Sequence, residues 1–391
     1  MKQFIIFGLI LLAPYTHTHA QDFKHILQSI EQHSLQLKAA HEEAEAEKSE
    51  AKADNTLESP EFGINYLWGN DDNGTRIDLS VSQSFAFPTV YVHKHKLSKL
   101  RQQNAQLRFL NERQNILLYA KQLCIEVVYY NALIDHLNRD VNHFKETTAK
   151  VKKLYEEGEA TILEYNRMNQ SCIAFENELR QAITNRNNLM AELKRLNGGN
   201  DVTLADNSYV HTPLPIDFES WLATNMEQHL SVQMAQSEVG VNHKALRVVQ
   251  HEWIPSIQVG YMSEKEKVDG YQGLTLGFSM PIWSGFHNVR AAKKRLSAAQ
   301  IRQTSIREEV ATSLRMLFSE ATELQRNMNN LSEGFKQYDI LGPLKKSFEA
   351  GAINAIDYFQ ETLWGHEMYK NMLESERDFE LKVAQLKATE L

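Results

Sequence analysis

Two acidic residues are the best candidates for chemistry in this sequence, and that chemistry would be the attraction of cations. Glu164 and Asp357 each stand six residues after a glycine that follows a long stretch typical of a helix. A ring of such carboxylates, contributed by several copies of a chain, is able to select cations. The alternative is that each carboxylate lies on a solvated helix face, because most charged residues are exposed. The sequence leaves both interpretations open.

Motifs of common enzymes are absent from the sequence. It contains no His-Glu-x-x-His metal motif, no Gly-x-Ser-x-Gly nucleophile turn and no glycine-rich phosphate loop. The 15 histidines are scattered. His93 and His95 are two residues apart, so they would point to different sides of a helix, and His243 and His251 have no partner set. We therefore expect no enzyme, no catalytic residue, no bound metal and no cofactor.

The chain has two cysteines, Cys124 and Cys172, which are too few for a disulfide framework. If the helices on either side of Gly158 form an antiparallel hairpin, the two cysteines would lie roughly 30 Å apart along its axis. We expect two free, packed thiols, and the same distance argues against metal binding by the pair.

Length and composition exclude several classes of protein. Only 17 glycines and 8 prolines punctuate 391 residues, so the elements must be long. The 42 basic and 50 acidic residues are interspersed, and no basic face predicts binding of nucleic acid. A mean hydropathy of −0.46 excludes a polytopic helical membrane protein.

Residues 1–20 combine Lys2, the apolar run 4–14 and a small-residue site ending at Ala20, which is typical of a secretory signal peptide.

An internal repeat organises the rest of the sequence. Pro60-Glu-Phe-Gly-Ile-Asn-Tyr66 recurs as Pro255-Ser-Ile-Gln-Val-Gly-Tyr261, at an offset of 195. Lys152-Lys-Leu-Tyr-Glu-Glu-Gly158 recurs as Lys345-Lys-Ser-Phe-Glu-Ala-Gly351, at an offset of 193. Several matches in the same order indicate a duplicated unit.

Each half repeats the same plan of short strands and long helices. Two runs per half alternate apolar and polar residues, as strands do. Residues 89–157 contain neither glycine nor proline and would form a helix roughly 100 Å long. Its counterpart carries a coiled-coil seam at Val310, Leu314, Leu317, Ala321, Leu324, Met328, Leu331, Phe335 and Tyr338.

The predicted division is a signal peptide at 1–20; a first repeat at 21–198, with a helix at 21–54, strands at 60–69 and 75–85, and helices at 89–157 and 160–197; a linker at 199–216; and a second repeat at 217–391, with a helix at 217–251, strands at 255–263 and 271–281, and helices at 286–348 and 353–389.

The strands have the length and pattern of strands that cross a bilayer. About nine to eleven residues suffice for a tilted strand, with an apolar face toward lipid and aromatic residues at the interfaces. Tyr66, Trp68, Tyr261 and Trp283 are the candidate interface aromatics. A soluble, half-buried sheet would alternate in the same way. Four strands cannot close a barrel in lipid, so closure would need several copies of the chain: two give eight strands and a filled lumen, three give twelve and a channel.

In this order of elements the sequence resembles the TolC-like outer-membrane efflux channels. The resemblance covers the mature chain and rests on the repeat, the hairpins, the strand exits Ser82-Gln-Ser-Phe-Ala-Phe-Pro88 and Ser279-Met-Pro-Ile-Trp-Ser-Gly285, and the turns Tyr155-Glu-Glu-Gly158 and Phe348-Glu-Ala-Gly351. It implies a mainly α-helical membrane protein, a coiled-coil helical barrel joined to transmembrane β-barrel strands and closed only as a homotrimer. The chain is most similar to the branch paired with heavy-metal and related resistance pumps.

The resemblance also implies location and partners. The barrel would lie in the outer membrane of a Gram-negative bacterium, in contact with its lipid, and the helices would project into the periplasm. The duct would passively export small molecules or metal ions delivered by an inner-membrane pump of the RND type through a periplasmic adaptor (membrane fusion) protein. A soluble periplasmic helical-hairpin scaffold or adaptor is the alternative.

The two glycine turns would form the periplasmic tip. By the resemblance, the residues that meet the adaptor are Gly158, Glu159, Ala160, Gly351, Ala352 and Ile353. The alternative is that both glycines are plain helix caps, since a tight reversal favours a residue tolerant of positive φ. In a trimer, Glu164 and Asp357 would place six carboxylates around the tunnel entrance.

Overall fold

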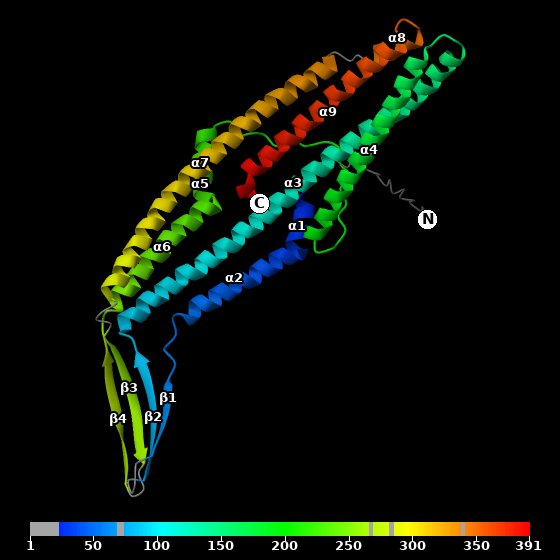
Figure 1. Ribbon diagram of the computed structural model, residues 1–391. Coiled ribbons are helices and arrows are strands. Elements are labelled where there is room, and N and C mark those ends of the chain that lie inside the picture. Colours follow the sequence, from blue (N-terminus) through cyan, green and yellow to red (C-terminus); the bar gives the residue numbers. More distant parts are fainter. Residues whose placement is uncertain (1–22, 69–73, 266–268, 281–284, 338–340) are drawn as a thin grey trace, which may run out of the picture.

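The computed structural model describes residues 23–68, 74–265, 269–280, 285–337 and 341–391. The expected signal peptide at 1–20 lies outside these residues. The molecule is elongated, with a small sheet at one end and two helical turns at the other (Figure 1). Long helices therefore connect two regions that are far apart.

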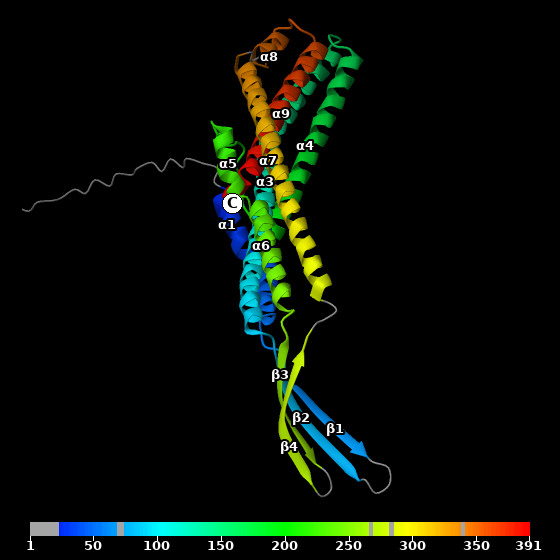
Figure 2. The same ribbon diagram turned by 90° about the vertical axis from the view of Figure 1, so that its left-hand side faces the viewer.

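The four strands form one antiparallel sheet. They are β1 (Glu61–Trp68), β2 (Thr75–Phe85), β3 (Ser256–Lys265) and β4 (Gly270–Ser279), and they lie in the order β1-β2-β3-β4. Two hairpins from the two halves are joined by the pairing of β2 with β3, which runs from Ile77 opposite Lys265 to Phe85 opposite Ile257. Figure 2 shows the sheet extending away from the helices.

The first half contributes four helices: α1 (Lys24–His33), α2 (Leu35–Ala53), α3 (Pro88–Glu156) and α4 (Ile162–Leu196). The prediction of one continuous helix at 21–54 is wrong, because the chain is extended at Ser34, with φ −59° and ψ 122°. There the Ser34 side chain accepts a hydrogen bond from the Leu37 amide and caps α2. Pro88 begins the 69-residue α3, where its missing N–H removes no hydrogen bond.

The second half contributes α5 (Phe218–Gln228), α6 (Leu230–His251), α7 (Gly285–Gln337), α8 (Leu341–Glu349), α9 (Ala355–Leu386) and a short 3₁₀ turn, η2 (Ala388–Glu390). The prediction of a single helix at 217–251 is wrong, because His229 is not in a helical conformation. Its ring accepts a hydrogen bond from the Ser231 amide and so caps α6. Within the helix expected at 286–348, the structure describes helix up to Gln337 and again from Leu341, with Pro343 in the first turn of α8, where a proline is tolerated. Residues 338–340 between them lie outside the described residues. Tyr338 lies outside the described residues.

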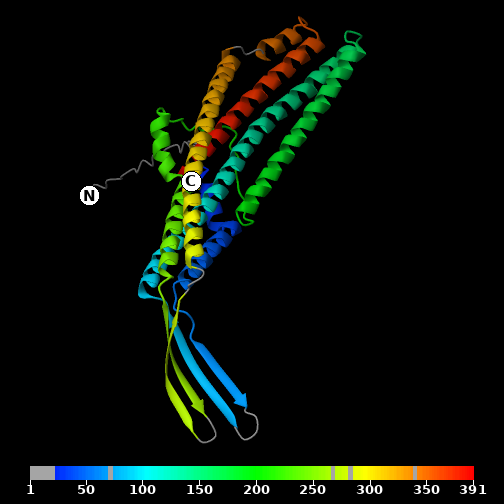
Figure 3. The same cartoon turned by 60° about the vertical axis from the view of Figure 1, so that its left-hand side comes forward.

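The helices pack through a chain of apolar clusters. Among the seam residues, Val310 and Leu314 are buried with Leu222 of α5 and Leu386 of α9, and Ala321 and Met328 are buried with Phe379 and Val383 of α9. A larger core joins α3, α4 and α9 around Phe144. Figure 3 shows these helices running side by side toward the two turns. The predicted seam is therefore a packing face.

The two cysteines are free, as predicted. Cys124 is buried in the cluster between α1, α3 and the end of α4, while half-buried Cys172 packs against the cluster around Phe144. The two thiols therefore pack in different apolar clusters.

Candidate functional site

The sheet separates apolar from polar side chains across all four strands. Residues that face each other in neighbouring strands share a side of the sheet. Phe62 lies opposite Val81, Val81 opposite Tyr261, and Tyr261 opposite Leu274. All four side chains are exposed, Leu274 to 86%. A continuous apolar face therefore crosses both hairpins.

The opposite face of the sheet is polar. Gly63 lies opposite Ser80, and Gly260 opposite Ser82 and Thr275. Near the loop end, Nε of Arg76 lies 2.7 Å from Oδ1 of Asp78, and its Nη2 lies 2.6 Å from Oε1 of Glu264. The pair of Arg76 with Glu264 links the hairpin of the first half to that of the second.

The predicted interface aromatics occupy different depths. Tyr66 and Trp68 lie at the loop end of β1, are both exposed, and have ring centroids 6.3 Å apart. Tyr261 stands in the middle of β3 and donates a hydrogen bond of 2.7 Å to Gln272. Trp283 lies outside the described residues.

The turn after α3 has the geometry of a glycine-capped helix end. Gly158 has φ +81°, and the Glu159 amide donates to the Leu154 carbonyl at 2.8 Å. The rings of Tyr155 and Tyr165 stack across the turn, 5.9 Å apart and nearly parallel. Glu159 is exposed, and Ala160 is half-buried against the core.

The turn after α8 repeats this geometry. Gly351 has φ +70°, the Ala352 amide donates to the Ser347 carbonyl at 2.9 Å, and Phe348 stacks on Tyr358 at 4.6 Å. Ala352 is exposed and Ile353 half-buried. Both turns lie at the end farthest from the sheet (Figure 1), so the predicted adaptor contacts come together at one end of the molecule.

The two predicted entrance carboxylates both take part in hydrogen bonds at helix starts, Glu164 in a capping box with Thr161 and Asp357 with the cap residue Asn354. Glu164 accepts from the Thr161 amide at 2.7 Å, while the Thr161 hydroxyl accepts from the Glu164 amide at 3.2 Å. Asn354 accepts from the Asp357 amide and donates to its carboxylate, both at 2.9 Å. A Thr-x-x-Glu spacing signals such a capping box in sequence, and Thr161 and Glu164 have that spacing. Capping positions both carboxylates at the start of α4 and α9.

A buried cluster of histidines and carboxylates was missed altogether. His136 and Asp140 of α3 meet His366 of α9 and Glu178 of α4. Burial lowers the pKa of His136 to about 4. Burial would also lower the pKa of His366, but its bonds to Asp140 and Glu178 prevail and raise that pKa to about 9.

A second pair of histidines lies in contact near the start of α3 and the end of α6. The ring of His251 packs against that of His93, with centroids 4.2 Å apart. His95 instead lies near Asn55. No third ligand group joins His93 and His251 among the described residues.

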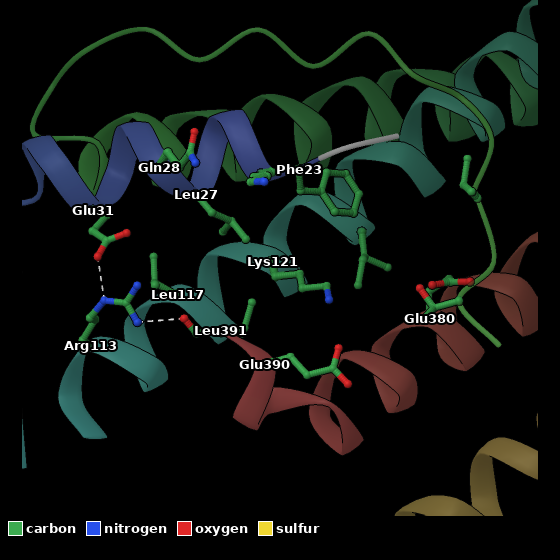
Figure 4. Close-up of a pocket in the computed structure, with 14 residues that line it drawn as sticks. Phe23, Leu27, Gln28, Glu31, Arg113, Leu117, Lys121, Glu380, Glu390 and Leu391 are labelled. Carbon is green, nitrogen blue, oxygen red and sulfur yellow. Dashed lines mark hydrogen bonds and ion pairs between the residues drawn. The ribbon is translucent and has the colours of Figure 1, made fainter. Parts of the chain in front are cut away.

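Residues of both halves line one pocket (Figure 4). Arg113 of α3 pairs with Glu31 of α1 at 2.7 Å and donates to the Leu391 carbonyl at 2.7 Å. Burial lowers the pKa of Lys121, while Glu390 and Glu380 oppose that effect. The polar side chains in Figure 4 thus tie α1 and α3 to the end of α9 and η2.

No family model and no curated protein matches this sequence. Solved structures do match its fold. CusC, from work on folding and transmembrane channel formation, has a TM-score of 0.78 at 12% identity, covering 95% of this chain and 92% of that chain. The Campylobacter jejuni CmeC outer membrane channel has a TM-score of 0.78 at 13% identity, covering 94% and 85%. The open-state Neisseria gonorrhoeae MtrE outer membrane channel has a TM-score of 0.76 at 12% identity, covering 94% and 88%.

The fold is thus that of the outer-membrane channels. The chain has the TolC-like architecture expected from its sequence, with long paired helices ending in a four-stranded sheet. Within the described residues, every helix falls short of the combined length and apolar character that a membrane-spanning helix requires.

Proposed function

We propose that the chain forms the outer-membrane exit duct of a tripartite efflux system in a Gram-negative bacterium. The observation that carries this proposal is the sheet, which exposes one apolar face and one polar face. Among the described residues, the helices lie beyond one end of the sheet and leave the apolar face uncovered (Figures 1 and 2). Lipid is the surrounding that suits such a face.

Closure of the sheet supports a homotrimer. In the described chain, β1 and β4 each pair along one side only, and an open edge is not tolerated in lipid. Three copies would supply twelve strands, enough to leave a lumen lined by the polar face. The long helices would continue the duct into the periplasm. A soluble scaffold would leave both the edges and the apolar face unexplained.

The exposed turns support docking to a periplasmic adaptor. Gly158, Glu159, Gly351 and Ala352 are all exposed at the end farthest from the sheet. A passive duct needs no catalytic group, because an inner-membrane pump of the RND type would supply the energy and select the small molecules or metal ions. The solved structures with this fold are channels, which supports a transport role without catalysis.

Glu164 and Asp357 would form an acidic ring at the entrance. Both carboxylates stand at helix starts beside the turns, and three copies would contribute six. Both carboxylates accept hydrogen bonds at helix starts, so alanine would remove a hydrogen bond and a charge together. Glu164→Gln and Asp357→Asn remove the charge, while glutamine is still able to accept from the Thr161 amide and asparagine from the Asn354 side chain.

The experiment measures single-channel conductance and cation selectivity of the purified protein in planar bilayers. We expect the wild type to conduct and the Gln/Asn double variant to prefer cations less strongly. Thr161→Ala removes a cap but no charge and serves as the matched control. Unchanged selectivity in the double variant would exclude the acidic ring. Recovery of the protein in the soluble periplasm, instead of the outer membrane, would refute the exit duct and favour the scaffold.

A further inference from the structure

Two helices, α3 and α9, bring two imidazoles and a carboxylate to one point inside the helical part of the chain. Oδ2 of Asp140 lies 3.1 Å from Nε2 of His136 and 2.9 Å from Nδ1 of His366. His136 and Asp140 are one turn apart on α3 and therefore share a face. His366 comes from α9, and the two imidazole rings stack nearly parallel, 5.2 Å apart. The same carboxylate oxygen thus faces both rings.

The cluster is buried but leaves hydrogen-bonding capacity unused. His366 is 2% exposed and His136 is 7% exposed. Nε2 of His136 is buried and makes no hydrogen bond of good geometry with any described residue, although it points at Asp140. A buried polar nitrogen without a partner is costly. An ion between the three groups would satisfy it.

The spacing of the three groups suits a small cation. Their ligand atoms all lie within 4.8 Å of one another. Around a tetrahedral zinc ion with ligand bonds of about 2.0 to 2.2 Å, ligand atoms are separated by about 3.3 to 3.6 Å. Small side-chain shifts would therefore accommodate the ion, and a water molecule would complete the coordination. Two imidazoles and one carboxylate favour Zn²⁺, Co²⁺, Ni²⁺ or Cu²⁺ over Mg²⁺ or Ca²⁺.

A second carboxylate stands where it would support a metal ligand. Oε2 of Glu178 lies 3.4 Å from Nε2 of His366, the ring nitrogen that does not face Asp140, at ion-pair distance but without hydrogen-bond geometry. Ligand histidines commonly direct their other nitrogen at a carboxylate, which fixes the ring and its tautomer. Lys370 holds Glu178 in place at 2.7 Å. Asp140 and Glu178 together would balance the charge of a divalent ion.

We propose that His136, Asp140 and His366 form a binding site for a divalent transition-metal ion, with Glu178 as the residue that orients His366. The ion would join α9 of the second half to α3 of the first, and Glu178 would connect α4 to the site through His366. Asp140 and Glu178 are partly exposed, so an ion could reach the site from water. The site does not depend on the proposed export function, and a metal-free trimer could still conduct.

Cobalt provides a direct test, because a Co²⁺ ion held by histidine and carboxylate absorbs visible light. The purified full-length protein is stripped with chelator, dialysed and titrated with Co²⁺, and Zn²⁺ is then added as a competitor. We expect an absorption band that saturates at about one ion per chain and that Zn²⁺ abolishes, as a single four-coordinate site predicts. His366→Gln should abolish the band, and Glu178→Gln should weaken Co²⁺ affinity by about 10-fold to 100-fold without changing the stoichiometry.

Two further variants keep the test decisive. His136→Gln removes one ligand but leaves the contacts of His366 with Asp140 and Glu178 intact, so it covers the case in which His366→Gln fails to fold. His211→Gln is the matched control, since His211 pairs with Glu380 and lies in another cluster. It should bind Co²⁺ as the wild type does. Absence of the band in the folded wild type, or a band that persists in His136→Gln, would overturn the proposal.

Discussion

Replacing Val81 by arginine tests whether the apolar face of the sheet meets lipid. Val81 lies one residue from the centre of the 11-residue strand β2, opposite Phe62 on one side and Tyr261 on the other. Arginine on the lipid face of a barrel costs about 2 to 4 kcal/mol near the bilayer midplane. Since about 1.4 kcal/mol is a factor of ten, the ratio of folded to unfolded protein should fall by about 30-fold to about 700-fold per chain.

The neighbouring position supplies the matched control. Ser80 is one residue away and faces the other side of the sheet, opposite Gly63 and Met262. Gly63 has no side chain, so Ser80→Arg finds room, and a water-filled lumen would hydrate its charge. We expect Ser80→Arg to fold nearly as well as the wild type.

The assay is folding into lipid vesicles over a range of urea concentrations, followed by the heat-sensitive migration that folded barrels show on gels. Loss of folding in Val81→Arg together with normal folding in Ser80→Arg would support the assigned faces. Equal folding of the two variants, or a larger defect in Ser80→Arg, would refute the reasoning. The difference between two adjacent residues is informative because local sequence and strand position are otherwise the same.

Three further predictions concern the helices. Phe144→Ala should destabilise the chain by about 3 to 5 kcal/mol, because the fully buried ring packs against Phe175 and Phe359; an unchanged thermal unfolding midpoint would contradict this. Burial raises the pKa of Cys124 to about 12, so iodoacetamide at pH 7 should modify that thiol only after unfolding, as mass spectrometry of labelled peptides would show. The hydrogen bond to Glu380 raises the pKa of His211, so its stabilising effect is complete below about pH 6.5 and is lost as pH rises through the folded-state pKa. Stability should therefore fall between pH 6 and 8 more in the wild type than in His211→Gln, and equal slopes would exclude this ion pair.

Local patterns were sufficient to predict most of the architecture. Alternation marks strands because successive side chains point to opposite faces, and the long stretch 89–157 without glycine or proline became α3 almost residue for residue. The two glycines predicted at helix reversals have positive φ, which few other residues adopt without strain. The aromatic pairs that stack across the two turns are equivalent in the repeat, because each residue of the second pair lies 193 positions after its counterpart in the first.

Breaks inside helices were predicted less well. Ser34 and His229 are ordinary residues for a helix surface, yet each caps the next helix and ends the previous one. Glycine and proline indicate a helix break by their own backbone preferences. A serine or histidine also occurs inside helices, so whether it caps a helix depends on where tertiary packing changes the direction of the chain. The capping box formed by Thr161 and Glu164 is predictable from sequence, because its two residues are only three positions apart.

The sequence by itself determined the repeat, the types of element and the alternating faces of each strand, because these depend on residues close together in the chain. Only the tertiary structure decided that the two hairpins join through β2 and β3 into one apolar face. It alone brought His366 to Asp140, across 226 positions. The pair His136 and Asp140 carries a helical spacing that sequence reveals, but its partner depends on how α9 packs on α3. Such contacts are set by the shapes of whole helices, which no local pattern encodes.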